Sequence, residues 1–207
     1  MWYSPEEYDK EIIDYNQVFM ALEGELDETE ARVTFIDFLR SNLGFAVELL
    51  TGIKLATYQE IALRGLMNRE YSMCIWGRGC GKTFIASIFC MMQAILENNS
   101  RMVVVGPTFR TSRFIFNKIE EILEGKKCHL ARQAFGMKKD KRNDLHQFIL
   151  PNKSAIAAIP LNGEKIRGFR ANILVIDEYL LMSREIIDTV LVPFLTAPQD
   201  MDERQEI

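Results

Sequence analysis

The residues best suited to chemistry form a glycine-rich turn between an apolar run and a helical pattern. Gly77, Gly79 and Gly81 alternate with other residues, and Lys82 and Thr83 follow directly. Backbone N–H groups of such a turn can wrap nucleotide phosphates, the lysine can reach the β- and γ-phosphates, and the threonine hydroxyl can hold Mg²⁺. The turn is therefore predicted to be a P-loop that binds ATP with Mg²⁺.

This loop departs from the usual pattern G-x-x-x-x-G-K-[ST]. The pattern puts its first glycine where Trp76 stands, and glycine comes one residue later, at Gly77. The glycines still tolerate positive φ, so a tight turn remains possible. Arg78 and Cys80 lie inside the loop, and Arg78 adds a cation there. The alternative is a glycine-rich turn that binds nothing.

A pair of carboxylates further along the chain favours the functional interpretation. Asp177 and Glu178 follow four apolar residues, 173–176, which are typical of a buried parallel strand. Ligands of open α/β sheets bind at the carboxyl ends of such strands. We expect Asp177 to support Mg²⁺ and Glu178 to activate water as a general base. A surface acidic pair is the alternative, but together with the P-loop the pair predicts a Mg²⁺-dependent nucleotide hydrolase.

The composition predicts a globular α/β domain. The chain has 207 residues, of which 48% are apolar. Residues 2–14 are acidic where a secretion signal would be basic and then apolar, and no apolar run is long enough to span a membrane. The four cysteines show no C-x-x-C spacing, which favours a reducing compartment without structural zinc.

Charge is distributed unevenly along the chain. Residues 1–32 hold ten Asp or Glu against two Lys or Arg, whereas residues 101–142 hold eleven Lys or Arg against four Asp or Glu. The basic segment suits a polyanionic partner, and an ordinary solvated surface is equally compatible with it. The candidate DNA contacts are Thr108, Arg110, Arg113, Lys138, Lys139, Lys141 and Arg142.

The order of elements predicts a mainly parallel sheet flanked by helices, because strands alternate with helices. Strands are expected over residues 73–76, 101–105, 148–150, 155–159 and 173–176. Helices are expected from Ser4 and over 30–41, 57–69, 82–97, 112–123 and 183–194, with 126–143 irregular. Residues 1–50 are expected to form an acidic helical lead-in, a lid or cap part, and 51–207 the P-loop core.

Four segments of the chain resemble the ATPase domain of the large terminase subunit, the DNA-packaging motor of tailed bacteriophages. They are Phe45–Glu48 with Leu55–Gln59, the loop Gly77–Thr83, Val105–Thr108, and Lys165–Arg170 leading into Val175–Glu178. The resemblance spans about residues 45–194. It implies a RecA-like P-loop NTPase fold and an ATP-driven motor.

The resemblance also implies roles for individual residues. Gln59 would contact the adenine edge, with Tyr58 packed nearby. Arg78 would sense the γ-phosphate within its own subunit. Arg167 matches an arginine finger presented to a neighbouring subunit's ATP, where an arginine stabilises transition-state charge.

The partners implied by the resemblance are double-stranded DNA, the portal protein and the small terminase subunit. Alone the chain would be a monomer, and on the procapsid a homo-oligomeric ring, a pentamer. It would act in the cytoplasm of the infected bacterial host and transiently at the portal vertex, without a membrane. The family's coupling motif and nuclease domain do not occur before Ile207, so the chain is expected to be a fragment of a longer protein.

Two other functions fit the same motifs. A helicase-like DNA translocase would share the glutamine, the P-loop and the acidic strand. A nucleotide-binding scaffold without turnover would share the P-loop, but binding alone needs no water-activating carboxylate, so Glu178 argues against it.

Overall fold

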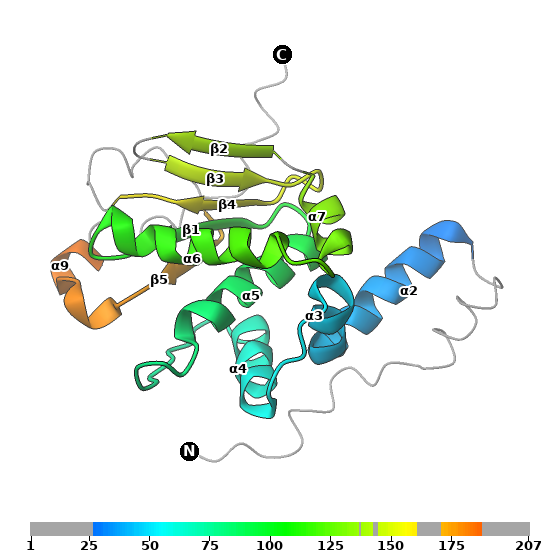
Figure 1. Ribbon diagram of the computed structural model, residues 1–207, viewed down its shortest axis with the longest axis horizontal. Coiled ribbons are helices and arrows are strands. Elements are labelled where there is room, and N and C mark those ends of the chain that lie inside the picture. The colour runs from blue at the N-terminus through cyan, green and yellow to red at the C-terminus, as the bar shows by residue number, and fades with distance from the viewer. Residues whose placement is uncertain (1–26, 137, 143–144, 161–170, 188–207) are drawn as a thin grey trace.

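The computed structural model describes residues 27–136, 138–142, 145–160 and 171–187 (Figure 1). The predicted helix from Ser4, the segment 161–170 with Arg167, and most of the predicted helix 183–194 lie outside these ranges. Within them, no helix combines the length and the apolar character that a membrane crossing requires.

The fold is organised around a five-stranded sheet in the order β2-β3-β4-β1-β5. Its strands are β1 (Arg101–Val105), β2 (Lys138–Arg142), β3 (Leu145–Ile149), β4 (Ala155–Ala158) and β5 (Ile173–Ile176). The central strand β1 pairs in parallel with β4 and with β5. Only β3 runs the other way, because it pairs antiparallel with both β2 and β4. The predicted mainly parallel α/β sheet is confirmed.

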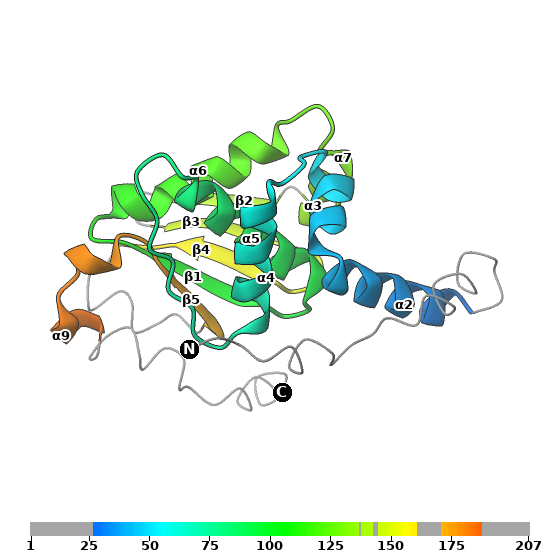
Figure 2. The ribbon, with the colours of Figure 1, turned by 90° about the horizontal axis from the view of Figure 1, so that it is seen from below.

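Helices α5 and α6 lie along one face of this sheet, and α3, α4 and α7 pack around α5 (Figures 1 and 2). The helices are α2 (Glu28–Ser41), α3 (Leu43–Thr51), α4 (Thr57–Asn68), α5 (Lys82–Leu96), α6 (Phe109–Leu123), α7 (His129–Phe135) and the short α9 (Arg184–Ile186), with a 3-10 turn over Tyr179–Leu181.

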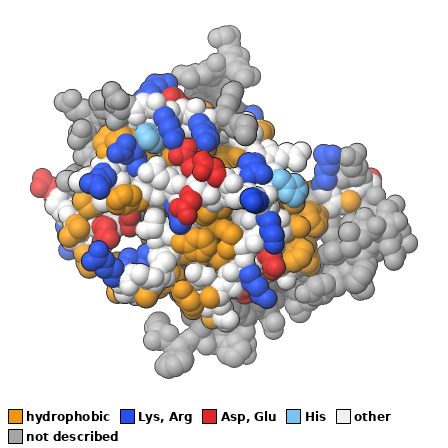
Figure 3. Space-filling model, in the orientation of Figure 1, with side chains coloured by type: hydrophobic (Ala, Val, Ile, Leu, Met, Phe, Trp, Pro, Cys, Tyr) orange, Lys and Arg blue, Asp and Glu red, His pale blue; other side chains and the backbone are white. Residues whose placement is uncertain are grey.

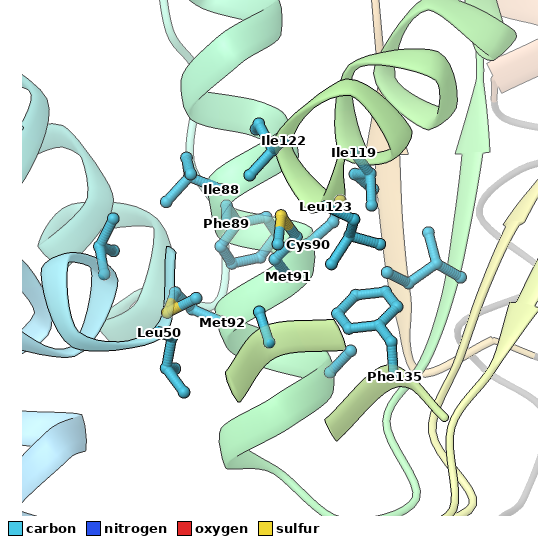
Figure 4. Close-up of a cluster of buried hydrophobic side chains, with 14 of the residues drawn as sticks. Leu50, Ile88, Phe89, Cys90, Met91, Met92, Ile119, Ile122, Leu123 and Phe135 are labelled. Atoms are coloured by element: carbon cyan, nitrogen blue, oxygen red, sulfur yellow. The ribbon is translucent and has the colours of Figure 1, made fainter. Parts of the chain in front are cut away.

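Helix α5 is the centre of the hydrophobic core. Its sequence is apolar on nearly every side, which is typical of a helix enclosed by other elements. Figure 4 shows its side chains Ile88, Met91 and Met92 surrounded by residues of α3, α6 and α7. Burial raises the pKa of the Cys90 thiol to about 12, so this cysteine acts as a packing group and not as a nucleophile.

Strand β1 is buried on both faces, as its unbroken apolar run predicts. Met102 and Val104 face the cluster that contains α5 and α6. Val103 and Val105 belong to a second cluster on the opposite face, with Ile187. This two-sided burial fixes the position of the strand that ends next to the P-loop helix.

Helix α5 is also tied to the N-terminal helices at its far end. The Arg40 guanidinium of α2 donates hydrogen bonds to the Leu96 carbonyl at 2.7 Å and to the Glu97 carboxylate at 3.0 Å. An arginine at the end of a helix complements the partial negative charge there. Whether residues 1–50 act as a separate lid or cap stays a prediction.

The strand predicted over residues 73–76 is wrong. This segment is irregular, with Met73 and Ile75 exposed to 68% and 84%. A strand needs a neighbour to share hydrogen bonds, and residues 73–76 pair with none of the five strands, although β5 lies at an edge of the sheet. The apolar run before the P-loop is therefore extended chain outside the sheet.

The expectation that residues 126–143 are irregular is also wrong, since they contain α7 and the edge strand β2. Every residue of β2 is charged, so no apolar alternation marks it in the sequence. Long-range contacts stabilise it: Lys139 and Lys141 form ion pairs with Glu120 of α6 at 3.2 and 2.7 Å. Charged residues on an edge strand also discourage pairing with other chains.

This ion-pair cluster yields a pH-dependent stability prediction. Partial burial raises the pKa of Glu120, but hydrogen bonds from Lys141 and Lys139 outweigh it and leave the pKa below its usual value of 4.5. The stabilisation is therefore complete above the usual pKa and is lost as pH falls through the lowered one. We expect Glu120→Gln to reduce the free energy of unfolding by about 1 kcal/mol at pH 7, measured by urea denaturation.

The matched control is Glu121→Gln, which makes the same charge change at a side chain that is exposed to 69% and pairs with Lys118. It should cost about 0.3 kcal/mol. Equal losses in the two variants at pH 7 would contradict the proposed role of Glu120.

Candidate active site

The glycine-rich turn leads directly into the N-terminus of α5. Gly79 and Gly81 adopt positive φ of 82° and 80°, a region that side chains rarely enter. Because Gly81 immediately precedes Lys82, the turn directs the free N–H groups of the helix start toward the loop. A turn of this kind can cradle an anion.

The Lys82 side chain folds back over the loop. Its ammonium donates hydrogen bonds to the carbonyl oxygens of Trp76 at 3.0 Å and Gly77 at 3.2 Å. The Cys80 N–H donates to the Gly77 carbonyl at 3.4 Å, and the Arg78 side chain is exposed. The Lys82 ammonium thus lies over the glycine-rich loop. A bound phosphate there would compete with the two carbonyl oxygens for hydrogen bonds from this ammonium.

The two carboxylates lie at the carboxyl end of β5, as predicted. The Asp177 N–H donates to the Val105 carbonyl at 2.9 Å, which aligns the ends of β5 and β1. The Glu178 N–H donates to Asp177 Oδ1 at 3.0 Å. Glu178 has a left-handed backbone, φ 52° and ψ 45°, and an exposed side chain. Such a conformation is strained for a residue other than glycine, and strain of this kind gathers at functional sites.

The surroundings of Asp177 raise the pKa of its carboxyl. Burial raises this pKa, and the charge of Glu178 raises it further. The Glu178 N–H and the positive charge of Lys82 lower it, without cancelling the increase. Lys82 is therefore close enough to act on Asp177, although the two are far apart in the sequence.

The side chains around Asp177 suit Mg²⁺ better than a metal ion whose ligands all come from the protein. A partly buried carboxylate with a raised pKa is stabilised by an added cation. Within the described ranges, no group of three or more His, Cys, Asp or Glu side chains could hold a metal. Mg²⁺ typically binds one or two protein side chains together with phosphates. Coordination of Mg²⁺ by Thr83, the second residue of α5, and by Asp177 stays a prediction.

The first turn of α4 lies against the P-loop. Gln59 Oε1 accepts a hydrogen bond from the Ala56 N–H at 2.9 Å, and its Nε2 lies 3.6 Å from where a Cβ on Gly81 would stand. The Tyr58 ring contacts Trp76 edge-on, with centroids 6.0 Å apart. The structure thus brings Tyr58 and Gln59 next to the loop, and their contacts with a nucleobase remain predictions.

Trp76 is the residue of this site that the sequence pattern did not assign. It stands where the usual loop has glycine, and the structure packs it against both Tyr58 and the main core. The signal in the sequence was the replacement of a small residue by the largest one. Arg167 lies outside the described residues, so its role as an arginine finger stays a prediction.

Most of the candidate DNA-binding cations have acidic or aromatic partners. Figure 3 shows Lys and Arg side chains interspersed with acidic ones over the face of the molecule that is turned to the viewer in Figure 1. Lys139 and Lys141 pair with Glu120, and Arg142 pairs with Asp140 at 2.7 Å. The positive charge of β2 is therefore partly neutralised within the chain. Lys138 belongs to the same strand, opposite Ile149.

The remaining candidates lie at the start of α6. The Thr108 hydroxyl caps the helix by accepting a hydrogen bond from the Thr111 N–H at 3.3 Å, so α6 begins earlier than predicted. The Arg113 guanidinium lies 5.0 Å from the Phe109 ring centre, and Arg110 is exposed. Thr108 thus has a structural task, and DNA binding by this group stays a prediction.

Comparison with known proteins identifies the family. Residues 73–191, more than half of the chain, match the family described as "Terminase large subunit, T4likevirus-type, N-terminal". This chain belongs to that terminase family. The resemblance to the large terminase subunit, drawn from four segments of the sequence, is confirmed.

Solved structures agree on the fold of this terminase domain. The ATPase domain of the Thermus phage P74-26 large terminase superposes with a TM-score of 0.54 and 18% identity, over 72% of this chain and 62% of that one. An arginine-to-alanine mutant of the same domain gives a TM-score of 0.52 and 18% identity, over 72% and 63%. The chain thus spans less than two thirds of the domains it matches. No curated protein sequence matches it.

The raised pKa of Asp177 predicts that this residue lowers stability at neutral pH. A carboxyl with a raised pKa in the folded state favours folding most below its usual value of 3.8, and this contribution is lost as pH rises through the raised pKa. Asp177→Asn should therefore raise the midpoint of thermal unfolding at pH 7, and the gain should vanish near about pH 3.5.

Asp140→Asn serves as the control, because it makes the same charge change but removes the ion pair with Arg142. Its midpoint should not rise. An unchanged or lower midpoint for Asp177→Asn at pH 7 would refute the assignment of a destabilising buried carboxylate.

Proposed function

We propose that this terminase domain hydrolyses ATP with Mg²⁺ and that hydrolysis drives double-stranded DNA into a procapsid. The observations that support the proposal most strongly are the glycine turn with positive φ at Gly79 and Gly81 before Lys82, and the partly buried carboxylate of Asp177 at the carboxyl end of β5, on which the charge of Lys82 acts. A cation for phosphates and a carboxylate for a metal are the two charges that phosphoryl transfer needs side by side.

Binding begins with an exchange of partners at Lys82. Its ammonium leaves the carbonyls of Trp76 and Gly77 for the β- and γ-phosphates, whose charge makes stronger hydrogen bonds. Thr83 and Asp177 would hold Mg²⁺, which would supply further stabilisation of phosphate charge. Arg78, whose side chain is exposed on the loop, is proposed to meet the γ-phosphate.

The acid–base step is assigned to Glu178. Its exposed carboxylate can take a proton from the attacking water, while Asp177 beside it stays committed to the metal. The different surroundings of the two carboxyls, one partly buried and one exposed, support this division of roles. Gln59 and Tyr58 are proposed to contact the adenine.

The remaining parts of the proposal concern assembly. They follow the family: a homo-oligomeric ring, a pentamer, on the portal protein, with the small terminase subunit, in the cytoplasm of the infected host and at the portal vertex. Arg167 would serve the ATP of the neighbouring subunit, and the full-length protein would also be an endonuclease. The family match favours this motor over a helicase-like translocase.

Lys82→Ala should abolish nucleotide binding, because no other lysine lies in the loop to meet the phosphates. Titration calorimetry with a non-hydrolysable ATP analogue and Mg²⁺ measures this directly. Lys126→Ala, which removes an exposed lysine far along the chain, should bind as the unmodified protein does. Full binding by Lys82→Ala would remove the P-loop assignment.

Glu178→Gln should separate binding from turnover. The amide keeps the shape of the side chain but cannot accept a proton, so ATP affinity should persist while phosphate release falls by roughly 10²-fold or more. Glu70→Gln, an exposed carboxylate outside the site, provides the matched control. Turnover near the unmodified rate would place the general base elsewhere.

A further inference from the structure

We propose that Trp76 is a positioning residue that holds the P-loop against α4 in the geometry that phosphate binding needs. This inference rests on the proposed nucleotide-binding function. It assigns a task to the residue that stands in place of the usual first glycine.

The first observation is that Trp76 is partly buried in an otherwise exposed arm, residues 68–80. From Asn68 to Cys80, every residue is exposed except Trp76. Its indole contacts Tyr58 in the first turn of α4, with centroids 6.0 Å apart and planes inclined by 69°, and it packs against the main core. Edge-to-face aromatic pairs of this kind are favourable beyond the area they bury.

The second observation concerns the backbone of the same residue. The Trp76 carbonyl accepts a hydrogen bond from the Lys82 ammonium at 3.0 Å. One residue therefore connects α4, through its side chain, with the phosphate-binding lysine, through its carbonyl. When Lys82 exchanges this carbonyl for phosphates, the indole contact remains to keep the loop in position.

The absence of a strand before the loop explains why an anchor is needed. Residues 73–76 share no ladder of hydrogen bonds with the described sheet, so the sheet does not fix the start of the loop. A glycine at position 76 would remove the one side chain of this segment that is partly buried, and it would increase backbone freedom. Ordering such a loop on binding would cost affinity.

The test compares affinities for a non-hydrolysable ATP analogue and for tripolyphosphate, which has no base. Trp76→Gly and Tyr58→Ala should each weaken both ligands by about 3- to 10-fold, the range that one aromatic pair supplies. The double variant should lose no more than either single variant, because both remove the same contact. Trp76→Phe should restore most of the affinity.

Tyr71→Ala is the matched control, since Tyr71 is an aromatic residue of the same arm but is 79% exposed. Its affinities should not change. If Trp76→Gly does not fold, Tyr58→Ala tests the same contact from an exposed ring. Unchanged affinities in Tyr58→Ala and Trp76→Gly would overturn the proposal, and so would a loss confined to the ATP analogue, which would make the pair a base-binding surface.

A spectroscopic measurement follows the exchange at Lys82. The chain has two tryptophans, so Trp2→Phe leaves Trp76 as the sole indole. Tripolyphosphate should change its emission, and should not do so when Lys82→Ala is added. Binding of neither ligand by the unmodified chain would instead refute the proposed function, an outcome distinct from failure of the Trp76 variants.

Discussion

The burial of α5 is the constraint on which the rest of the structure depends. This helix starts at Lys82, the lysine proposed to bind phosphates, and passes through the hydrophobic core, so the packing that stabilises the fold also fixes the candidate site. Ser87 connects the core packing of α5 with the candidate site. Its hydroxyl lies within hydrogen-bonding distance of the Thr83 carbonyl on its own helix, at 2.7 Å, and of the Ile115 carbonyl on α6, at 3.2 Å. Helix α6 is thereby held beside the start of α5.

The parallel pairing of β1 with β5 supplies the other half of the site. In a parallel pair both carboxyl ends meet at one edge, and here the Asp177 N–H bonds the last carbonyl of β1. The sheet thus delivers a carboxylate to the edge at which α5 presents its lysine. The cost of holding that carboxylate partly buried is visible in its raised pKa, which is typical of a group kept for function and not for stability.

Local patterns in the sequence predicted the strands that are enclosed by apolar groups along their whole length and the residues that belong to short motifs. Apolar runs predicted β1 and β5, and the motif chemistry predicted where Lys82 and Asp177 would lie. The failures share a physical cause, since each depends on contacts between distant segments. The charged strand β2 is stabilised by Glu120 from α6, and the apolar run 73–76 finds no partner strand although its composition suits one. The packing of Trp76 on Tyr58 is likewise a tertiary contact that no local pattern encodes.

The link between Arg40 and the end of α5 has a mechanical consequence. The helix has 15 residues, so its two ends are separated by about 22 Å of continuous hydrogen-bonded backbone. Nucleotide phosphates would bind at the N-terminal end of α5. At its C-terminal end, the Arg40 guanidinium of α2 donates a hydrogen bond to the Leu96 carbonyl. The helix contains no proline or glycine at which it could bend, so it is expected to move as a rigid body. An axial displacement at the lysine would therefore arrive at α2 as a displacement of the same size.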